Sequence, residues 1–301
     1  MTLLEVIKKR LVHIHRMHIL TRNKLRKLLQ WDPSLNKIHK LTVHELQKLL
    51  SLKDKQASKL HKSLQSKTSQ RETIKVLSNY NVVTIIDDNY PNVLKTIKDP
   101  PIVLYTLGNI KLFTNHPLLS VVGTRNPSIK AREKVEKLVR PIVKEGWTIV
   151  SGMALGIDSY AHELALGLGG NTIAVLGSGF DYIYPRRNID LFHSIKKNGL
   201  VITEYPPHIK ANRYHFPERN RIISGLSFGT LVIEATTKSG TLTTVDQALD
   251  QGREVYAVPD SPLVRQAIGC NKLIQEGATL VLSAEDILKD WDYSRNYRYE
   301  N

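Results

Sequence analysis

The sequence predicts an α/β protein in which a doubly wound, Rossmann-like, mostly parallel sheet follows a small N-terminal all-helical domain. From Tyr80 onward, short runs rich in Val and Ile alternate with amphipathic stretches of helical period. Buried strands separated by helices are typical of a parallel sheet covered on both faces. Residues 1–75 lack this alternation and carry 18 Lys or Arg against 5 Asp or Glu, whereas the rest of the chain carries 25 against 23. This break predicts two units with different surfaces.

The first unit, placed at residues 1–76, is expected to be a bundle of short helices. Its apolar residues recur at helical spacing in three groups, which are Leu3, Leu4, Ile7, Leu11 and Ile14, then Leu25, Leu28 and Leu29, and finally Leu46, Leu49 and Leu50. Thr21 and Thr42 are candidate N-caps. The Lys-rich faces of these helices are either solvated or in auxiliary contact with phosphates.

The second unit, placed at residues 77–291, is expected to contain the sheet. Its candidate strands are 82–86, 102–106, 118–122, 147–151, 172–176, 200–203, 229–234, 254–258 and 279–282. Its candidate helices are 128–145, 157–168, 187–197, 217–226, 241–251 and 264–276. The last residues, 292–301, are expected to form a polar tail.

Composition narrows the functional classes. The 43 Lys and Arg against 28 Asp and Glu leave a formal net charge of +15, which favours a polyanionic partner such as nucleic acid or an anionic membrane. The one cysteine, Cys270, excludes an intramolecular disulfide framework and a Cys-based zinc site, so a reducing cytoplasm fits best. No apolar run approaches the ~18 residues that span a bilayer, and no membrane insertion is expected.

In doubly wound sheets ligands bind beyond the carboxyl ends of the strands, so the residues after each apolar run form the candidate site. Gly123, Arg125 and Ser128 follow the strand 118–122. A helix N-terminus offers free backbone N–H groups and the positive end of the helix dipole, and Ser128 is the candidate cap of the next helix. Arg125 could add a bidentate phosphate contact. An ordinary strand-to-helix turn is the alternative for this segment alone.

Glycines end two further strands. Gly152 follows one of them, and Gly177 and Gly179 follow another. Small residues at such places let a ligand backbone approach closely. Gly177 and Gly179 do not complete a dinucleotide fingerprint, because Tyr182 stands where the third glycine belongs, and the sequence also lacks a GxxxxGK[ST] phosphate loop. We therefore expect no nucleotide cofactor.

Arginines interleaved with aromatic residues occur in two later segments. In sites for single-stranded nucleic acid, guanidinium groups bind phosphates and aromatic rings stack on unpaired bases, at ~1 to 3 kcal/mol per base. The candidates are Tyr184, Arg186, Arg187 and Asn188, then Lys210, Arg213, Phe216, Arg219, Asn220 and Arg221. A further turn that opens a helix and could hold an anion contains Lys238, Ser239, Gly240 and Thr241. Phe216 could equally be a core residue, and one arginine could pair with Glu204 or Glu218.

Taken in order, these motifs resemble the DNA-processing protein A family (DprA, also called Smf). The match is carried by GTR at 123–125, SGMALGID at 151–158, GSGFDYIYPRRN at 177–188, FPERNRIIS at 216–224, SGTL at 239–242 and NKLI at 271–274. The resemblance implies an extended Rossmann-like domain that dimerises, coats and protects single-stranded DNA, and loads the RecA recombinase onto it during natural transformation. It also implies a small N-terminal helical domain.

Position by position, the resemblance places the phosphate-binding basic residues at Arg125, Arg186 and Arg213, with Lys210 as a substitute for the last. Self-association in the family uses the last part of the domain, where the apolar candidates in this chain are Ile274 and Leu280. Both could also be core residues. The expected partners are therefore single-stranded DNA, RecA and a second copy of the chain, in the cytoplasm.

An enzyme is the main alternative. The segment 239–242 also resembles the Gly-Gly-x-Gly-Thr signature of nucleotide phosphoribohydrolases of the lysine-decarboxylase-like family. Those enzymes need a glutamate after that turn, and Thr243 and Thr244 stand there instead. A hydroxyl cannot serve as the carboxylate of a general acid–base pair. The sequence therefore favours binding over catalysis.

No Ser-His-Asp set and no clustered His-Glu metal site is evident in the sequence. His13, His15 and His18 lie within a basic helical segment and are expected on its solvated face. We therefore predict neither catalytic residues nor a metal. A structural or membrane-surface module is the third alternative, but it does not account for the arginines that follow the strands.

Overall fold

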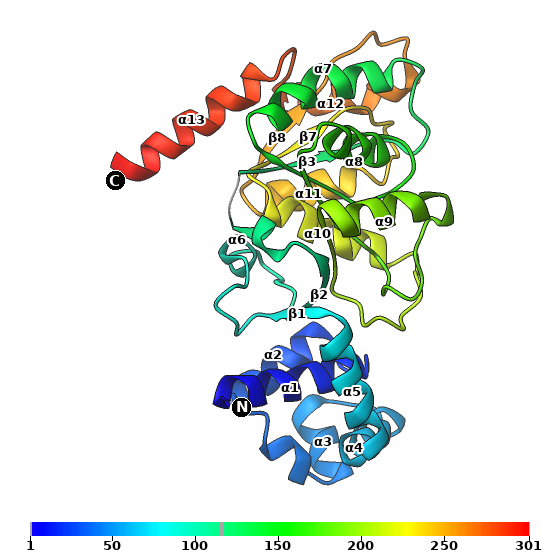
Figure 1. Cartoon of the computed structure of the whole chain (residues 1–301), viewed down its shortest axis with the longest axis vertical. Coiled ribbons are helices and arrows are strands. Elements are labelled where there is room, and N and C mark those ends of the chain that lie inside the picture. Colours follow the sequence, from blue (N-terminus) through cyan, green and yellow to red (C-terminus); the bar gives the residue numbers. More distant parts are fainter. Residues whose placement is uncertain (1, 115–116, 301) are drawn as a thin grey trace.

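The computed structural model describes residues 2–114 and 117–300, the last six of these by their backbone. A bundle of helices forms one end of the molecule and a larger α/β domain forms the other (Figure 1). The chain enters the sheet through α5 (Lys67–Asn79) and β1 (Asn81–Thr84). The two parts share apolar packing where Val82 of β1 and Tyr105 of β2 (Val103–Gly108) meet the bundle.

Helix caps and a leucine-rich centre organise the bundle. Before α5 it contains α1 (Leu3–Arg16), α2 (Arg22–Trp31), the 3-10 helix η1 (Lys37–Lys40), α3 (Val43–Leu50) and α4 (Asp54–Gln65). The Thr42 hydroxyl accepts a hydrogen bond from the Glu45 N–H in a capping box, which confirms Thr42 as the cap of α3. Thr21 stands at the cap position of α2 without such a bond. The fully buried centre includes Leu11, Ile14, Leu28, Leu46 and Leu60.

The expectation of solvated histidines is wrong for two of the three. His13 is 4% exposed, and its Nδ1 lies 2.8 Å from the Thr73 hydroxyl of α5. The Nδ1 of His15 lies 3.0 Å from the Tyr105 hydroxyl of β2. Helix α1 therefore packs against α5 on one side and against the sheet on another. This tertiary packing covers two polar positions that the sequence pattern alone assigns to solvent.

These histidines make the stability of the bundle depend on pH. Burial lowers the pKa of His13 to about 4 and that of His15 to about 3, from 6.5. Below pH 6.5 the unfolded chain therefore binds more protons than the folded chain, so acid favours unfolding. We expect the free energy of unfolding to fall between pH 6.5 and 4, by up to about 1.4 kcal/mol per pH unit for each histidine.

Urea unfolding of the full chain at pH 7 and at pH 5 measures this effect. The His13→Gln variant is the matched test, because glutamine keeps a polar side chain but does not titrate. It should lose part of the pH dependence. The same pH dependence in the variant and in the wild-type chain would contradict the assignment to His13.

The α/β domain is built on a single sheet, which among the described residues has nine strands in the order β1-β2-β6-β5-β4-β3-β7-β8-β9. The remaining strands are β3 (Leu118–Val122), β4 (Thr148–Ser151), β5 (Asn171–Val175), β6 (Leu200–Thr203), β7 (Gly229–Val232), β8 (Glu254–Ala257) and β9 (Thr279–Leu280). Strand β2 pairs antiparallel with β1 and with β6, and the pairs from β6 to β9 are parallel. The predicted mostly parallel sheet is confirmed.

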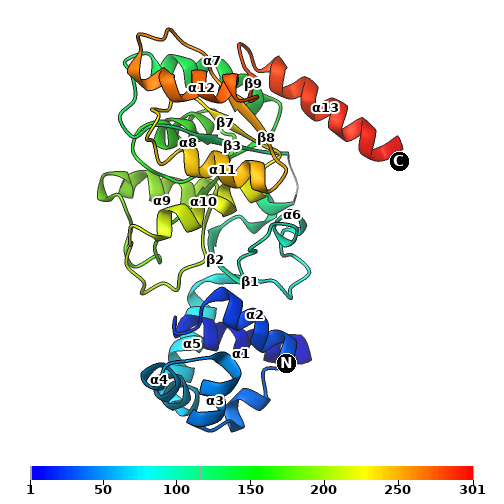
Figure 2. The same cartoon turned by 180° about the vertical axis from the view of Figure 1, so that it is seen from behind.

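Helices cover both faces of the sheet (Figure 2). On one face lie α7 (Ala131–Lys144), α8 (Ile157–Gly167) and α9 (Ile189–Asn198), and on the other lie α6 (Asn92–Lys95), α10 (His215–Leu226), α11 (Leu242–Asp250) and α12 (Ile268–Gln275). Side chains of a strand alternate between the faces. In β3, Leu119 and Val121 pack with α7 and α8, whereas Leu118 and Val122 pack with α10 and α11. The doubly wound class follows.

The direction of winding reverses at β3. From β3 the chain runs through β4 and β5 to β6, and it then returns to β7 on the other side of β3. The loop after β3 leads to α7 on one face, and the loop after β7 leads to α11 on the opposite face. Such a reversal opens a crevice beyond the carboxyl ends of the two strands, which is where open α/β sheets bind ligands.

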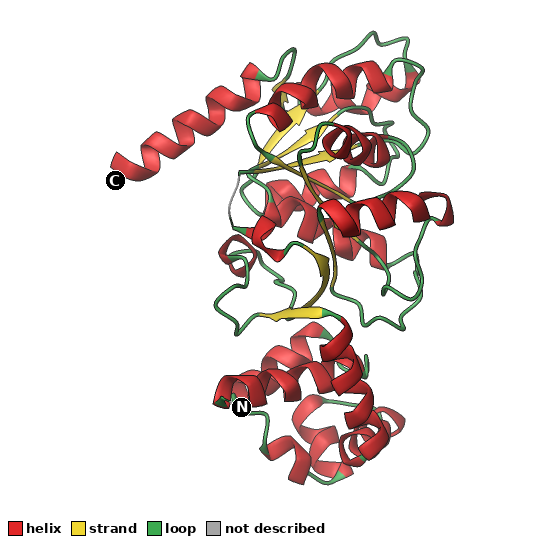
Figure 3. Cartoon of the chain, in the orientation of Figure 1, coloured by secondary structure: helices red, strands yellow, loops and turns green. Residues whose placement is uncertain are grey.

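At the C-terminus, α13 (Glu285–Glu300) extends away from the α/β domain (Figure 3). The segment expected as a polar tail is therefore helical up to Glu300. The Trp291 ring holds the start of this stretch, because it contacts Trp147 at 5.4 Å and Phe228 at 5.1 Å between centroids. Among the described residues, no helix combines the length and the apolar character needed to cross a bilayer.

Candidate functional site

A cavity of about 320 Å³ lies at the reversal of the sheet, beyond the ends of β3 and β7. We call it the carboxyl-edge pocket. It is lined by Val122, Gly123, Thr124, Arg125, Asn126, Ala154, Asp158, Phe216, Pro217, Arg219, Asn220, Ile223, Thr236, Ser239, Gly240, Thr241, Thr243 and Thr244. The loops after β3, β4 and β7 and the first turns of α10 thus converge on one place, as the strand-end argument predicted.

A cation and two aromatic rings stand together at this pocket. The Arg125 guanidinium lies 5.5 Å from the centroid of the Phe216 ring, and the Tyr184 ring centroid also lies 5.5 Å from that of Phe216. A smaller cavity of about 40 Å³, also lined by Gly152 and Leu155, continues the pocket between Tyr184 and Phe216. Arg125 is exposed and has no ion pair with the described residues. Its charge is therefore available to an anionic ligand.

Four predicted glycines shape the site through close packing of protein on protein. A side chain at Gly123 would collide with Ile157, and one at Gly152 with the Arg219 guanidinium. A Cβ at Gly177 would lie 3.0 Å from the Phe216 ring, and one at Gly179 would collide with the Pro206 and Pro207 carbonyls. The glycines therefore allow the loops to approach one another. For Gly152, Gly177 and Gly179 the predicted role was to admit a ligand backbone, whereas this packing shows contacts within the protein.

Arg219 lines the pocket but works as part of its floor. Its side chain is 4% exposed, and its Nη1 donates hydrogen bonds to the carbonyls of Gly152, at 2.6 Å, and Val175. These bonds tie the ends of β4 and β5 together. Burial lowers the pKa of Arg219 to about 10, against the opposing charge of Asp158. Burial raises the pKa of Asp158, because it disfavours the charged form of a carboxyl group as it does that of a guanidinium. The Asp158 Oδ2 accepts hydrogen bonds from the Gly152 and Ala154 N–H groups.

Asn220 and the loop after β7 form the opposite wall. The Asn220 amide donates to the Thr243 hydroxyl at 2.8 Å. Ser239, Gly240 and Thr241 precede α11 and direct the start of that helix at the pocket, while Lys238 is exposed and has no ion pair with the described residues. The positive end of the α11 dipole favours an anion here, and Lys238 belongs to the same loop without lining the pocket.

Three residues that were predicted to bind the ligand instead bind other groups of the protein. The Ser128 N–H and hydroxyl both donate to the buried Glu234 carboxylate, at 2.8 and 2.5 Å, so an internal anion already fills the place expected for a phosphate. The Asn188 amide donates to the Met153 carbonyl and the Ser159 hydroxyl. These two groups therefore hold loops together and are not open to a ligand.

Arg221 is the third of these residues. It lies on the other side of α10, where it pairs with Glu204 at 2.5 Å and Asp99 at 3.5 Å. Its side chain is 5% exposed, so no external phosphate reaches it. The sequence had left open that one arginine pairs with Glu204, and Arg221 is that residue.

Besides Lys238 and Arg221, four predicted cations lie outside the lining of the pocket. Arg186 and Arg187 lie in the 3-10 helix η3 (Arg186–Asn188), which follows Tyr184, and both are exposed. Lys210 and Arg213 precede α10 and lie over the rings of Tyr182 and Tyr214, at 5.1 and 4.6 Å. Among the described residues, none of these four cations takes part in an ion pair.

The two residues predicted for self-association differ in exposure. Leu280 is 42% exposed on β9, the last strand of the sheet. Ile274 is partly buried against the core cluster beneath α10, α11 and α12. Leu280 therefore lies on an edge strand that is open to a second copy of the chain. Ile274 instead packs mainly against the core of its own domain.

Several lining residues escaped the sequence argument. Thr124, Asn126, Thr236 and Thr244 add hydroxyl and amide groups to the pocket, and Asp158 adds its one carboxyl group among the described lining residues. Three of these residues could have been identified by their position in the sequence, because Thr124, Asn126 and Thr236 lie in the loops directly after β3 and β7. No group of three His, Cys, Asp or Glu residues in the described part of the chain is placed to hold a metal.

Comparison with known proteins agrees with this architecture. The family model for DNA recombination-mediator protein A matches residues 81–292. The DNA processing protein DprA of Bacillus subtilis (strain 168) is 45% identical over 219 residues, which are 73% of this chain and 73% of that protein. The X-ray structure of DprA from Streptococcus pneumoniae superposes with a TM-score of 0.82 at 36% identity, covering 93% of this chain and 97% of that one.

A second solved structure concerns DprA from Helicobacter pylori and is described for its single-stranded DNA binding mode. It superposes with a TM-score of 0.64 at 28% sequence identity, and the match covers 72% of this chain and 98% of that chain. The similarity therefore extends over nearly the whole of the Helicobacter pylori chain.

Proposed function

Because the chain belongs to the DNA recombination-mediator protein A family, we propose that it binds single-stranded DNA at the carboxyl-edge pocket and passes that DNA to RecA without altering it. The observation that carries the proposal is the unpaired guanidinium of Arg125 beside the rings of Phe216 and Tyr184. A strand of unpaired nucleotides needs this combination of a phosphate-binding cation and stacking surfaces. The binding of single-stranded DNA by the Helicobacter pylori relative supports the same assignment.

The geometry suggests how the strand lies. One phosphate binds Arg125 and the start of α11, and a neighbouring base stacks at Tyr184 and Phe216. In this proposal Arg186 and Arg213, both exposed and outside the pocket lining, bind further phosphates of the strand. Stacking accepts every base, and the polar side chains that line the pocket are mostly hydroxyls and amides. We therefore expect little sequence preference.

Salt dependence and strand preference provide the first test. If about four phosphates are neutralised, the affinity for an oligo-dT should fall about 50-fold between 50 and 200 mM salt. Duplex DNA of the same sequence should bind much more weakly, because its paired bases cannot stack on protein rings. A gel-shift titration of both forms at both salt concentrations measures this. Equal affinity for the two forms would count against the site.

The proposal is binding without turnover. The one carboxyl group that lines the pocket among the described residues, Asp158, is buried and accepts hydrogen bonds from two backbone N–H groups, so it is held as part of the floor. We expect no free base when the protein is incubated with nucleoside monophosphates and the products are separated by chromatography. Base release that disappears in a Thr243→Ala variant would instead favour the hydrolase class.

The remaining steps of the proposal are those that the family resemblance implies. We propose that the protein protects incoming DNA in the cytoplasm during natural transformation, loads RecA onto it, and acts as a dimer through the sheet edge near Leu280. The buried, unpaired Cys270 fits a reducing compartment. Light scattering with Leu280→Glu tests the dimer, since a charged residue on an edge strand opposes association. An unchanged mass in the variant would place the dimer contact elsewhere.

A further inference from the structure

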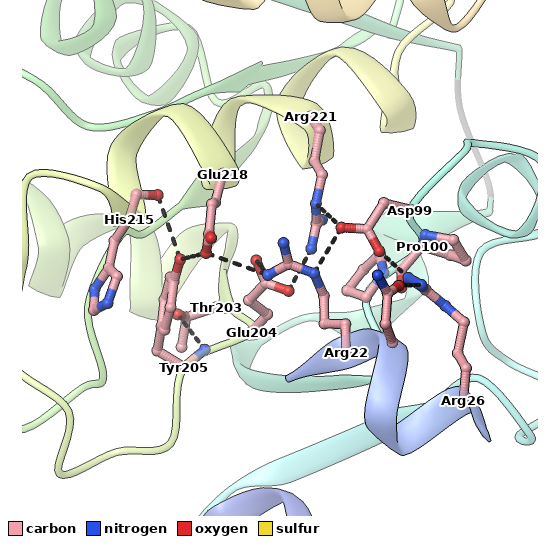
Figure 4. A network of polar contacts seen from close by, with 12 residues as sticks. Arg22, Arg26, Asp99, Pro100, Thr203, Glu204, Tyr205, His215, Glu218 and Arg221 are labelled. Carbon is pink, nitrogen blue, oxygen red and sulfur yellow. Dashed lines mark hydrogen bonds and ion pairs between the residues drawn. The ribbon is translucent and has the colours of Figure 1, made fainter. Parts of the chain in front are cut away.

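Helix α10 lies between the carboxyl-edge pocket and the N-terminal bundle. Residues three or four apart share one face of a helix. Phe216, Arg219 and Asn220 therefore face the pocket together, whereas Glu218 and Arg221 share another face. Figure 4 shows this second face, where both side chains point toward carboxylates and arginines from other parts of the chain. The first turns of α10 thus contact the proposed DNA site with one face and the bundle with another.

Arg22 of α2 reaches this second face from the bundle. Its Nη1 lies 3.2 Å from the Glu218 carboxylate and 3.5 Å from Glu204, and its Nε lies 2.7 Å from Asp99. Arg221 shares Glu204 and Asp99 with it. These contacts form a chain of charges, which we call the interdomain network (Figure 4). Arg22 is its direct link between the bundle and α10.

Aromatic residues add a second link at the same turn. The Tyr205 hydroxyl donates to Glu218 at 2.9 Å, and the His215 ring stacks on Tyr205 at 4.0 Å. His18 of the bundle meets both rings edge-on, at 6.2 and 6.4 Å. The His215 Nδ1 lies 3.0 Å from the Gly177 carbonyl, beside the Phe216 ring. A movement of the bundle on this side would therefore displace the residue next to the proposed base-stacking ring.

The interface is packed differently on its two sides. Where α1 and α5 meet β1 and β2, buried apolar residues of both parts form one continuous cluster. On the α2 side lies a cavity of about 420 Å³, lined by His18, Arg22, Asp99, Glu204 and Glu218 among others. Apolar packing thus fixes one side, and charged contacts around a cavity close the other. Such contacts can break individually without exposing a core.

We propose that Arg22 is a positioning residue for single-stranded DNA. By holding Glu218 it fixes the first turn of α10, and that turn sets Phe216 and Arg219 at the carboxyl-edge pocket. The inference rests on the proposed function. Because energetic coupling between two sites is reciprocal, DNA in the pocket must strengthen the docking of the bundle by the same factor by which docking strengthens DNA binding.

Affinity measurements on the full chain test the coupling. Arg22→Ala should weaken oligo-dT binding about fivefold or more, the usual lower range for coupled sites. Lys27→Ala is the matched control, because it removes one exposed charge from the same helix and has no recorded ion pair. It should change affinity by less than twofold. Glu218→Gln should weaken binding as Arg22→Ala does, and the double variant should lose no more than the stronger single variant, since both remove the Arg22–Glu218 contact.

Hydrogen exchange distinguishes coupling through Arg22 from a purely structural role of that residue. Oligo-dT should slow exchange in α2 of the wild-type chain, none of whose residues lines the pocket, and should not do so in Arg22→Ala. Additive losses in the double variant, or Arg22→Ala indistinguishable from Lys27→Ala, would overturn the inference alone. A wild-type chain that fails to bind oligo-dT would overturn the proposed function and this inference together.

Discussion

The Arg125→Glu variant should bind oligo-dT several hundred-fold more weakly than the wild-type chain at low salt. A hydrogen bond to a charged group contributes up to about 3 kcal/mol, or roughly 100-fold, and the introduced carboxylate adds repulsion from the phosphate. The loss should be specific to DNA binding, because Arg125 is exposed, contacts the Phe216 ring and forms no ion pair within the described part of the chain. Folding should therefore be unaffected. Fluorescence anisotropy with a labelled oligonucleotide measures the affinity.

Lys144→Glu is the matched control for the same charge reversal. Lys144 is exposed at the last residue of α7, whereas Arg125 lies in the loop before that helix. The control should lose only the small contribution of long-range attraction, within about threefold at 150 mM salt, where charges further apart than ~8 Å are largely screened. Equal losses in the two variants would mean that net charge, and not the pocket, binds the DNA.

Replacing Arg219 with Met should destabilise the protein by about 2 to 6 kcal/mol, because it leaves the buried Gly152 and Val175 carbonyls without this donor, at about 1 to 3 kcal/mol each. It also removes the Arg219 charge that opposes the effect of burial on the pKa of Asp158. Met fills a similar volume, so the loss reports the polar contacts. Urea unfolding followed by circular dichroism gives the free energy of unfolding.

The sequence alone predicts a different result for Arg219, which it groups with the phosphate-binding arginines. Under that interpretation Arg219→Met would weaken DNA binding and leave stability unchanged. A second variant, Arg219→Met with Asp158→Asn, should recover part of the lost stability, because it removes the unpaired buried carboxylate. Wild-type stability in Arg219→Met would contradict the structural role.

The strands and helices of the α/β domain were predictable because apolar periodicity identifies each of them and turn or cap residues mark where it begins and ends. The ranges 118–122 and 200–203 coincide with β3 and β6. Helix α7 begins later than predicted, at Ala131, because the preceding residues form a loop in which Ser128 binds Glu234. Strand β1 ends at Thr84, where the Asp87 carboxylate accepts the Thr84 N–H and turns the chain.

The location of the carboxyl-edge pocket was predictable from strand ends, but the contacts of each side chain were not. Whether an arginine faces solvent or an internal carboxylate depends on partners far away in sequence. Arg221 pairs with Asp99, and Ser128 with Glu234, more than a hundred residues away in each case. Burial of His13 depends in the same way on Thr73. Periodicity identifies the face of an element and leaves its tertiary neighbours undetermined.

Photocrosslinking tests the central claim most directly. An oligo-dT containing 5-iododeoxyuridine is bound to the full chain and irradiated, and the crosslinked peptides are identified by mass spectrometry. Because bases are proposed to stack at the carboxyl-edge pocket, the account predicts crosslinks at Tyr184 or Phe216. Crosslinks confined to the N-terminal bundle or to α13, with Tyr184 and Phe216 unmodified, would contradict it.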